Sequence, residues 1–153
     1  PASTQRDAAS GAPLGLDQHR GTILYIEDDL ANLTLVRHVL GRQPELRLLH
    51  AATGQAGLDL AARHLPDLVL LDLHLPDTEG RTVLRRLRET DATRHIPVVV
   101  VSASAMPRDV EDVMRAGIFR YLTKPLDISQ FLETVGAALD SGRSSDGPTG
   151  GTA

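Results

Sequence analysis

The chain alternates between strand-like and helix-like segments, and this alternation occurs five times. The strand-like segments are short runs rich in apolar and β-branched residues, at positions 22–26, 46–51, 68–71, 96–101 and 118–122. Strands that alternate with helices through short connections are typical of a parallel sheet, because each crossover between parallel strands places a helix on one face of the sheet. We therefore expect an α/β fold made of five βα units.

Polar residues distinguish the edges of this sheet from its centre. The first, third and fourth strand-like segments are almost entirely apolar, as strands covered on both faces must be. The second segment contains Arg47 and His50, and the fifth contains Arg120. Because edge strands tolerate polar and charged side chains, the second and fifth strands are predicted to form the two edges.

The helix-like segments carry apolar residues at three- and four-residue spacing, which predicts one buried face on each helix. These residues are Leu30, Leu33, Val36 and Leu40 in the first helix, Leu58, Ala61, Ala62 and Leu65 in the second, Val83, Leu84 and Leu87 in the third, Val110, Val113 and Met114 in the fourth, and Ile128, Phe131, Leu132, Val135 and Leu139 in the fifth. Gly41 and Gly117 are expected to end the first and fourth helices, and Asp127 is expected to cap the fifth, with Gln130 three residues later.

The two ends of the chain differ in composition from its middle. Residues 1–21 and 141–153 are rich in Ala, Ser, Gly, Thr and Pro and contain few large apolar side chains. Such segments bury too little surface to offset the entropy cost of ordering, so we expect a disordered N-terminal linker and a disordered C-terminal tail around a domain at 22–140. The first residue is Pro1, which favours a piece of a longer chain.

Composition excludes several classes of function. The formal net charge of -4 argues against DNA binding through general attraction to phosphates. The absence of cysteine excludes disulfides, thiolate metal sites and a cysteine nucleophile, and is compatible with a cytoplasmic location. Since the sequence contains no apolar run of membrane-spanning length and no signal-like N-terminus, membrane insertion is not expected.

Chemically active side chains follow four of the five predicted strands. Glu27 and Asp28 follow the first, Asp72 the third, Ser102 the fourth and Lys124 the fifth. In open parallel sheets, binding sites form at the carboxyl ends of the strands, so these side chains are expected to converge.

The convergence of several carboxylates favours a bound cation. Carboxylates packed closely repel one another unless a cation compensates, and Mg²⁺ is suited to carboxylate, water and phosphate oxygens. An Asp in this setting can act as a phosphoryl-accepting nucleophile, while a lysine and a hydroxyl stabilise the transferred group.

Four segments together resemble the receiver domains of response regulators, in particular those similar to the chemotaxis regulator. These segments are Ile23–Asp28, Leu70–Gly80, Val99–Ala103 and Tyr121–Pro125, and the resemblance extends over about residues 22–140. It implies a flavodoxin-like (βα)5 doubly wound fold with a five-stranded parallel sheet in the order 2-1-3-4-5. It also implies a phosphoacceptor of a two-component, histidine-to-aspartate signalling system, which catalyses only its own phosphorylation and slow dephosphorylation.

The resemblance assigns a metal site to this chain. Asp72 is expected to be the phosphoacceptor, and Asp28, Asp72 and the backbone carbonyl of His74 are expected to bind Mg²⁺, with Mn²⁺ as a second candidate. Glu27 stands where Asp is commoner and is expected to act through a water molecule.

The resemblance also assigns residues to phosphoryl binding and switching. Ser102, Ala103 and Lys124 are expected to bind the phosphoryl group, and Ser102 with Tyr121 is expected to form the switch. The Lys124–Pro125 peptide bond is expected to be cis. An aromatic residue on an edge strand is also commonly a packing residue, so Tyr121 retains that alternative.

Two further residues are hypothesised to tune the lifetime of the acyl phosphate. His74 stands two residues after Asp72, and Ser104 stands two residues after Ser102. We expect these side chains to control the access of water to the phosphoryl group.

The implied partners are a histidine kinase or a histidine phosphotransfer domain. A downstream protein is expected to bind the face formed by the fourth helix, the fifth strand and the fifth helix, where an exposed Phe119 could mark a partner surface. A fragment of a hybrid sensor kinase is the first interpretation, and a stand-alone regulator without an output domain is the second.

Two other classes of protein share parts of this pattern. A haloacid-dehalogenase-like aspartyl phosphatase also uses an Asp nucleophile, a hydroxyl, a lysine and Mg²⁺, but needs a second Asp where this chain has His74. A flavodoxin-like cofactor binder would need a Gly- and Thr-rich phosphate loop after the first strand, and neither that loop nor a Gly-x-Gly-x-x-Gly motif is present.

Overall fold

The computed structural model describes residues 16, 19–104 and 106–152, with side chains described as far as residue 142. The strands are β2 (Gly21–Ile26), β3 (Leu46–Ala51), β4 (Leu68–Leu71), β5 (Val98–Ser102) and β6 (Arg120–Thr123). The helices are α2 (Leu30–Leu40), α3 (Gly54–His64), α4 (Gly80–Glu89), α5 (Pro107–Arg115) and α6 (Ile128–Thr152). Strands and helices alternate throughout, so the predicted α/β class is confirmed.

The five strands form one parallel sheet in the order β3-β2-β4-β5-β6. This is the predicted order 2-1-3-4-5, and the strands that contain polar residues, β3 and β6, lie at the edges. The register aligns the last residues of neighbouring strands: Ile26 pairs with both Ala51 and Leu71. The residues that follow these strands therefore emerge together at one side of the sheet.

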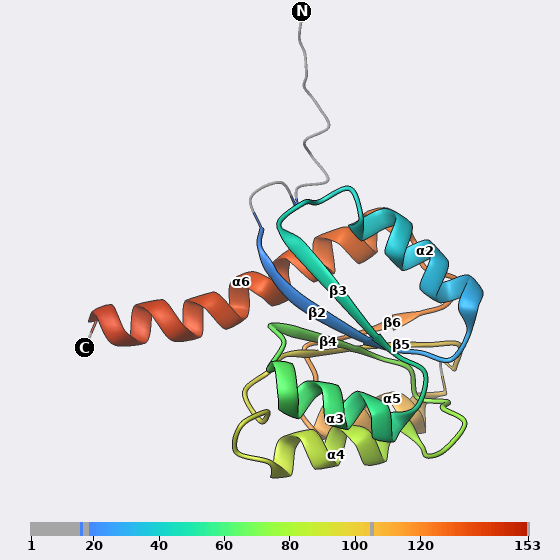
Figure 1. Ribbon diagram of the computed structural model, residues 1–153. Helices are drawn as coiled ribbons and strands as arrows, with labels where there is room; N and C mark the ends of the chain where they lie inside the picture. The colour runs from blue at the N-terminus through green and yellow to red at the C-terminus, as the bar shows by residue number, and fades with distance from the viewer. Residues whose placement is uncertain (1–15, 17–18, 105, 153) are drawn as a thin grey trace, which may run out of the picture.

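Helices cover both faces of the sheet (Figure 1). α2 and α6 lie on one face, and α3, α4 and α5 lie on the other. Because side chains alternate along a strand, β2 contributes Ile23 and Tyr25 to the core beneath α2 and α6, and Leu24 and Ile26 to the core beneath the other three helices. This two-layered core is the physical basis of the continuous apolar runs in the central strands.

Most of the predicted helical core is buried, but five of the expected residues are exposed. Leu33, Val36, Val83 and Val135 are among the buried ones. The exposed residues are Leu30, Ala62, Leu65, Met114 and Ile128.

Two of the exposed residues, Leu30 and Leu65, follow from where the helices begin and end. Leu30 is 72% exposed because it is the first residue of α2, where the helix has not yet reached the sheet. Leu65 lies beyond the end of α3, where it adopts a left-handed conformation with φ of 47°. At these positions the spacing of apolar residues predicted a buried helix face that is one turn longer than the observed one.

The predicted helix caps are present. The Asp127 side chain accepts a hydrogen bond of 2.9 Å from the backbone N–H of Gln130. Gly41 follows the last residue of α2, and Gly117 has a φ of +89° just after α5, a conformation that glycine adopts without strain.

Two features of the structure lie outside the range 22–140 that was expected for the domain. Leu16, within the expected linker, is buried in the core and lies beside Gly136 of α6. His19 contacts Asp140 through its Nε2 atom, at 3.1 Å. At the other end, α6 continues to Thr152, beyond the expected boundary at residue 140, and residues 1–15 of the linker lie outside the described residues. Disorder of the linker and of the tail stays a prediction.

None of the helices in the described ranges combines the length and the apolar character that crossing a membrane requires.

Candidate metal and phosphoryl site

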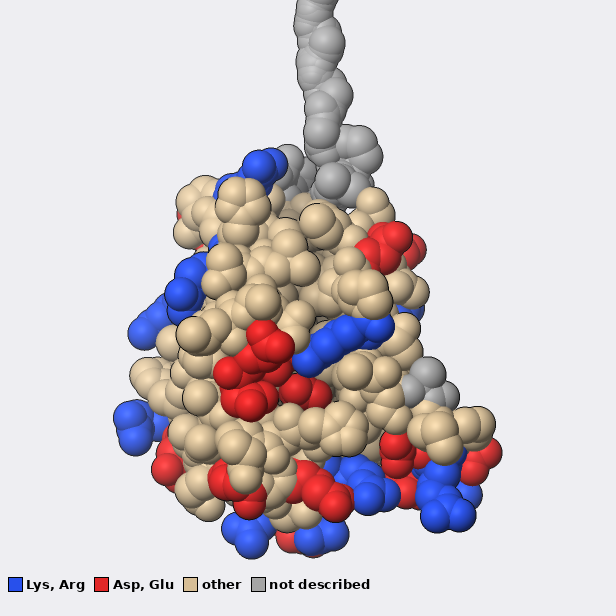
Figure 2. Space-filling view, turned by 90° about the vertical axis from the view of Figure 1, so that its right-hand side faces the viewer, with Lys and Arg blue, Asp and Glu red and all other residues tan. Residues whose placement is uncertain are grey.

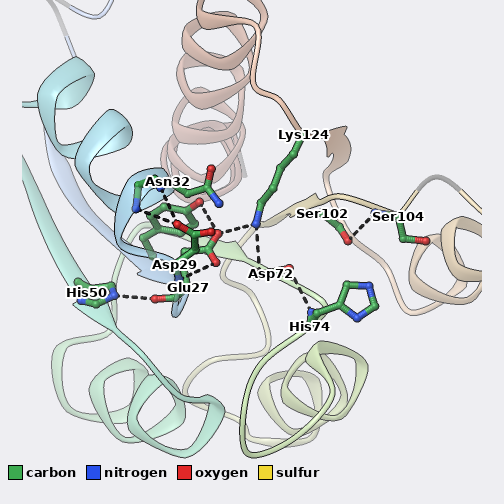
Figure 3. A network of polar contacts seen from close by, with 11 residues as sticks. Glu27, Asp29, Asn32, His50, Asp72, His74, Ser102, Ser104 and Lys124 are labelled. Atoms are coloured by element: carbon green, nitrogen blue, oxygen red, sulfur yellow. Dashed lines mark hydrogen bonds and ion pairs between the residues drawn. The ribbon is translucent and has the colours of Figure 1, made fainter.

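The alternation of side chains along three strands brings Glu27, Asp72 and Lys124 together. Each of them stands two residues after a residue that packs beneath α2 and α6, so each continues toward that same side of the sheet. Because β2, β4 and β6 end at the same edge, residues far apart in sequence become neighbours there. Figure 3 shows this convergence.

A lysine links two of the carboxylates. The Nζ atom of Lys124 lies 2.8 Å from Oε1 of Glu27 and 3.2 Å from Oδ2 of Asp72 (Figure 3). Glu27 is fully buried and Asp72 is 4% exposed. The buried negative charges are thus partly neutralised by a cation that belongs to the chain itself.

A third carboxylate completes an acidic pocket. One carboxylate oxygen from each of Glu27, Asp28 and Asp72 lies within 4.8 Å of the others. Asp28 is exposed, whereas the other two are buried, so the pocket opens to solvent on the side of Asp28. Figure 2 looks onto the edge toward which the strands point and shows acidic side chains gathered at its centre beside a basic one. This set of hard oxygen donors fits Mg²⁺ or Mn²⁺.

Glu27 has three further hydrogen-bond contacts besides the one with Lys124. Its Oε1 also accepts a hydrogen bond of 2.9 Å from the hydroxyl of Tyr25, and its Oε2 accepts one of 3.2 Å from the backbone N–H of Asp29. Its backbone carbonyl lies 2.7 Å from Nε2 of His50 on the neighbouring strand. Glu27 is therefore fixed at both its backbone and its side chain.

Burial and charge shift the pKa values of these groups. Burial raises the pKa of Glu27, and the neighbouring Asp72 adds to this rise, although the hydrogen bond from Lys124 opposes it. Burial alone lowers the pKa of Lys124, but the hydrogen bonds and charges of Glu27 and Asp72 outweigh it and raise that pKa. Burial, together with the charge of Glu27, raises the pKa of Tyr25 strongly, so its hydroxyl stays a donor.

Asp29 has a structural role. Its side chain accepts hydrogen bonds from the backbone N–H groups of Ala31 and Asn32 and caps α2. The acidic triplet after β2 is therefore divided between two pocket residues and one helix cap.

Ser102, Ser104 and Tyr121 form a second group of contacts near the end of β5. The backbone N–H of Ser104 donates to the hydroxyl oxygen of Ser102 at 3.2 Å, and the hydroxyl of Tyr121 donates to the backbone carbonyl of Ser104. The hydroxyl of Ser104 in turn donates to Asp109 of α5 at 2.8 Å. Ser104 thus connects the buried Ser102 hydroxyl both to α5 and to the Tyr121 ring.

The loop after Asp72 is held against the end of β4. The backbone N–H of His74 donates to Oδ1 of Asp72 at 3.1 Å, while the His74 side chain is exposed. The backbone N–H of Gly80 donates to the carbonyl of Leu73 at 2.8 Å. A Cβ at position 80 would lie 2.4 Å from the carbonyl oxygen of Asp72, so glycine is required for this close approach.

The remaining sequence-based expectations have mixed outcomes. The Lys124–Pro125 peptide bond is cis. Ala103 is exposed at the end of β5, next to Ser102. Phe119 is not an exposed aromatic: it is half-buried against the core, with the guanidinium of Arg120 placed 5.6 Å from the centre of its ring.

Two residues of the site were missed by reasoning from sequence. Tyr25 and His50 were treated only as strand residues, yet both contact Glu27. The position of Tyr25, two residues before Glu27 on a strand, was the available signal, because strand residues two apart share a face. For His50 no such local signal exists, since its contact depends on the pairing of β2 with β3.

This fold and this pocket are those of a receiver domain, and comparison with known proteins agrees. The chain belongs to the response regulator receiver domain family, because residues 23–136 match the sequence pattern of that family. Members of this family are phosphoacceptors of two-component signalling rather than catalytic enzymes.

Two curated relatives are response regulators. The polar-differentiation response regulator DivK of Brucella anthropi is 35% identical over 118 residues, which are 77% of this chain and 95% of that protein. The DivK protein of Brucella ovis is 34% identical over the same shares of both chains.

Solved structures of receivers share the fold. The receiver domain of a sensor histidine kinase from Pseudomonas aeruginosa PAO1, described with a magnesium ion coordinated in its active site cleft, is 26% identical with a TM-score of 0.72, and the match covers 79% of this chain and 98% of that one. The Mn²⁺-bound response regulator Rcp1 is 30% identical with a TM-score of 0.67, covering 76% and 90%. A CheY-like receiver from Methanospirillum hungatei JF-1 is 25% identical with a TM-score of 0.76, covering 82% and 98%.

Proposed function

We propose that Asp72 accepts a phosphoryl group from a phosphohistidine of a partner protein, with Mg²⁺ bound beside it. The observation that carries this proposal is the position of Lys124, whose Nζ lies within hydrogen-bond distance of Glu27 and Asp72 beside a third carboxylate. A nearly buried carboxylate next to a cation and an open acidic pocket is the arrangement that phosphoryl transfer to an aspartate needs.

The donor set of the pocket supports a divalent cation. Asp28, Asp72 and the backbone carbonyl of His74 would hold Mg²⁺, with Glu27 contacting it through water, and Mn²⁺ fits the same oxygen donors. When bound, the cation supplies positive charge that offsets the negative charge of the transferred phosphoryl oxygens.

The transfer itself uses groups of this chain. A carboxylate oxygen of Asp72 forms the new P–O bond while the P–N bond to the donor histidine breaks, and the electron pair of that bond stays on the imidazole nitrogen. Lys124 gives up its contacts with Glu27 and Asp72 and pairs with a phosphoryl oxygen instead. The hydroxyl of Ser102 accepts from Ser104, which leaves its hydrogen available to donate to another phosphoryl oxygen, and Ala103 contributes to the same binding.

The contacts of Ser104 supply a route from the phosphoryl group to the surface. When the Ser102 hydroxyl turns toward a phosphoryl oxygen, its contact with the backbone N–H of Ser104 changes. The hydroxyl of Tyr121 donates to the carbonyl of Ser104, so Tyr121 follows the movement of that backbone. This change reaches α5, β6 and α6, the face where a downstream protein binds.

His74 and Ser104 control the lifetime of the acyl phosphate, because they limit the access of water to the phosphoryl group. Replacing both residues is expected to change the rate of its hydrolysis.

The donor we propose is a histidine kinase or a histidine phosphotransfer domain in the cytoplasm. The chain acts either as part of a hybrid kinase or as a separate regulator. Both arrangements occur among its relatives and structural neighbours, which include response regulators and receiver domains of histidine kinases.

Phosphorylation by a small-molecule donor tests the central proposal. The purified chain is incubated with acetyl phosphate and Mg²⁺, and its intact mass is measured for wild type, Asp72→Asn and Asp59→Asn. Asp59 is an exposed carboxylate on α3 and serves as the matched control. We expect the mass of one phosphoryl group to be added to wild type and to Asp59→Asn but not to Asp72→Asn.

This experiment and a second assay separate the alternatives. A mass gain that persists in Asp72→Asn would contradict the assignment of the phosphoacceptor. Continuous release of phosphate from a phosphate monoester over many turnovers would instead favour the haloacid-dehalogenase-like phosphatase.

Thermal unfolding gives an independent check of cation binding. A cation that binds the folded state raises Tm, and Asp28→Asn should abolish that rise.

A further inference from the structure

We propose that Tyr25 is a positioning residue of the divalent-cation site, and that its buried hydroxyl fixes the orientation of the Glu27 carboxylate. Tyr25 does not contact the cation in this proposal and acts only through Glu27. The inference rests on the proposed function, because it assigns a role to Tyr25 in the cation site that the proposed function requires.

The location of Tyr25 makes its contact with Glu27 obligatory. Tyr25 is fully buried on β2, a central strand, and lies in register with His50 on one side and Leu70 on the other. A buried tyrosine hydroxyl needs a hydrogen-bond partner, and here that partner is Oε1 of Glu27 at 2.9 Å. Since Glu27 is also fully buried, moving either side chain would leave both polar groups without this bond.

The other donors to Glu27 show why Tyr25 matters during the transfer. Oε1 accepts from both Tyr25 and Lys124, whereas Oε2 accepts from the backbone N–H of Asp29. Lys124 is the donor that leaves when it pairs with a phosphoryl oxygen. Tyr25 is then the donor that stays on Oε1 and keeps the carboxylate from rotating.

The length of the acidic side chain agrees with this role. Residues 25 and 27 point to the same side of β2, and the tyrosine hydroxyl stands far from the strand backbone. The extra methylene of glutamate allows the carboxylate at position 27 to meet that hydroxyl. An aspartate at this position would be too short to keep the contact without a shift of the strand.

Calorimetric titration of Mg²⁺ and Mn²⁺ into Tyr25→Phe tests the proposal without any phosphorylation. The variant removes the hydroxyl and keeps the ring, so packing of the core is retained. We expect both cations to bind about tenfold more weakly, at the lower end of the effect of removing a group that orients a metal ligand. The matched control is Thr93→Val, which removes another buried hydroxyl, bonded to the carbonyl of Leu87 at 2.7 Å, on the far side of the sheet from Glu27. It should leave cation affinity unchanged.

A double-mutant cycle distinguishes positioning from a general structural role. In a Glu27→Gln background, Tyr25→Phe should have no further effect on cation affinity, because the carboxylate that it orients is gone. A Tyr25→Phe variant that binds cations as wild type does overturns the proposal. So does a loss of the same size in both backgrounds.

A second measurement keeps the proposal testable if Tyr25→Phe fails to fold. The chain contains two tyrosines, so protein labelled with 3-fluorotyrosine gives two ¹⁹F resonances, which Tyr121→Phe assigns. We expect the Tyr25 resonance to shift with Mg²⁺ in wild type but not in Glu27→Gln, and an unmoved resonance in wild type contradicts the proposal.

Failure of the proposed function gives a different result. In that case wild type itself neither binds the cations nor takes up a phosphoryl group. Failure of the role of Tyr25 alone leaves both properties of wild type intact.

Discussion

Lys124 and Glu27 form an ion pair of 2.8 Å although 97 positions separate them in the chain. The side chain of Lys124 is 15% exposed and that of Glu27 is fully buried, so solvent screens this pair weakly. The pair holds the lysine beside Asp72 before any phosphoryl group arrives. The lysine is therefore already in the position that the proposed phosphoryl transfer requires.

Replacement of Lys124 should change cation binding and phosphoryl uptake in opposite directions. Lys124→Met removes positive charge from the pocket, so we expect Mg²⁺ to bind about tenfold more tightly, as the carboxylates then repel one another without compensation. Uptake from acetyl phosphate should slow by about a hundredfold, because a charged donor to the transferred group is lost. Calorimetry and intact-mass kinetics measure the two effects, and a parallel fall of both quantities would disagree with this account.

Replacement of Arg88 should destabilise the fold without touching the pocket. Its guanidinium donates to the backbone carbonyls of Arg94, Ile96 and Gly117, at 3.1, 2.8 and 2.9 Å. Arg88→Met leaves these acceptors without their donor, and we expect a loss of about 2 kcal/mol in the free energy of unfolding. Urea denaturation measures it, with Arg85→Met, an exposed arginine on the same helix, as the control.

A side chain at position 80 should displace the backbone of Asp72 and Leu73, just after β4. The Cβ of Gly80→Ala would lie 2.4 Å from the carbonyl oxygen of Asp72 and 2.6 Å from Cα of Leu73, and both of these are backbone atoms that cannot turn aside. We expect a loss of about 2 kcal/mol of stability and slower phosphoryl uptake, because Asp72 must shift. Gly142→Ala is the matched control, since its Cβ would meet its nearest neighbour at 4.0 Å. Equal behaviour of the two variants would show that the close approach at position 80 is unimportant.

The charge of Asp77 should stabilise the fold at neutral pH, and this contribution should disappear in acid. The carboxylate of Asp77 lies at the N-terminus of α3, where it accepts hydrogen bonds from the backbone N–H groups of Gly54 and Gln55. These hydrogen bonds lower the pKa of Asp77. A pKa that folding lowers stabilises the folded state above the unfolded pKa, and this contribution is lost as the pH falls through the folded pKa. Asp77→Ala should therefore have a lower Tm than wild type at neutral pH, and the difference should shrink below about pH 4. A difference that stays constant down to the acid transition would argue against this cap.

Local patterns in the sequence determined the class of fold and the main site residues. Apolar runs identified the covered strands, and Arg47 and Arg120 marked the two that lie at the edges. Acidic residues and a lysine directly after strands indicated the pocket, because parallel strands that end together must bring the following residues together. Asp72, Asp28 and Lys124 were predicted for this reason.

Contacts between distant segments were decided only by the tertiary structure. Periodicity placed Leu30 in the core, and this was wrong, because periodicity cannot say where along its length a helix leaves the sheet. Composition placed Leu16 in a linker, although its side chain is buried, because composition cannot say where a single residue folds back onto the core. The contacts of Glu27 with Tyr25 and His50 depend on side-chain reach and on strand pairing. A sequence pattern reports which face a residue occupies, whereas the partner it meets there is set by the packing of the whole sheet.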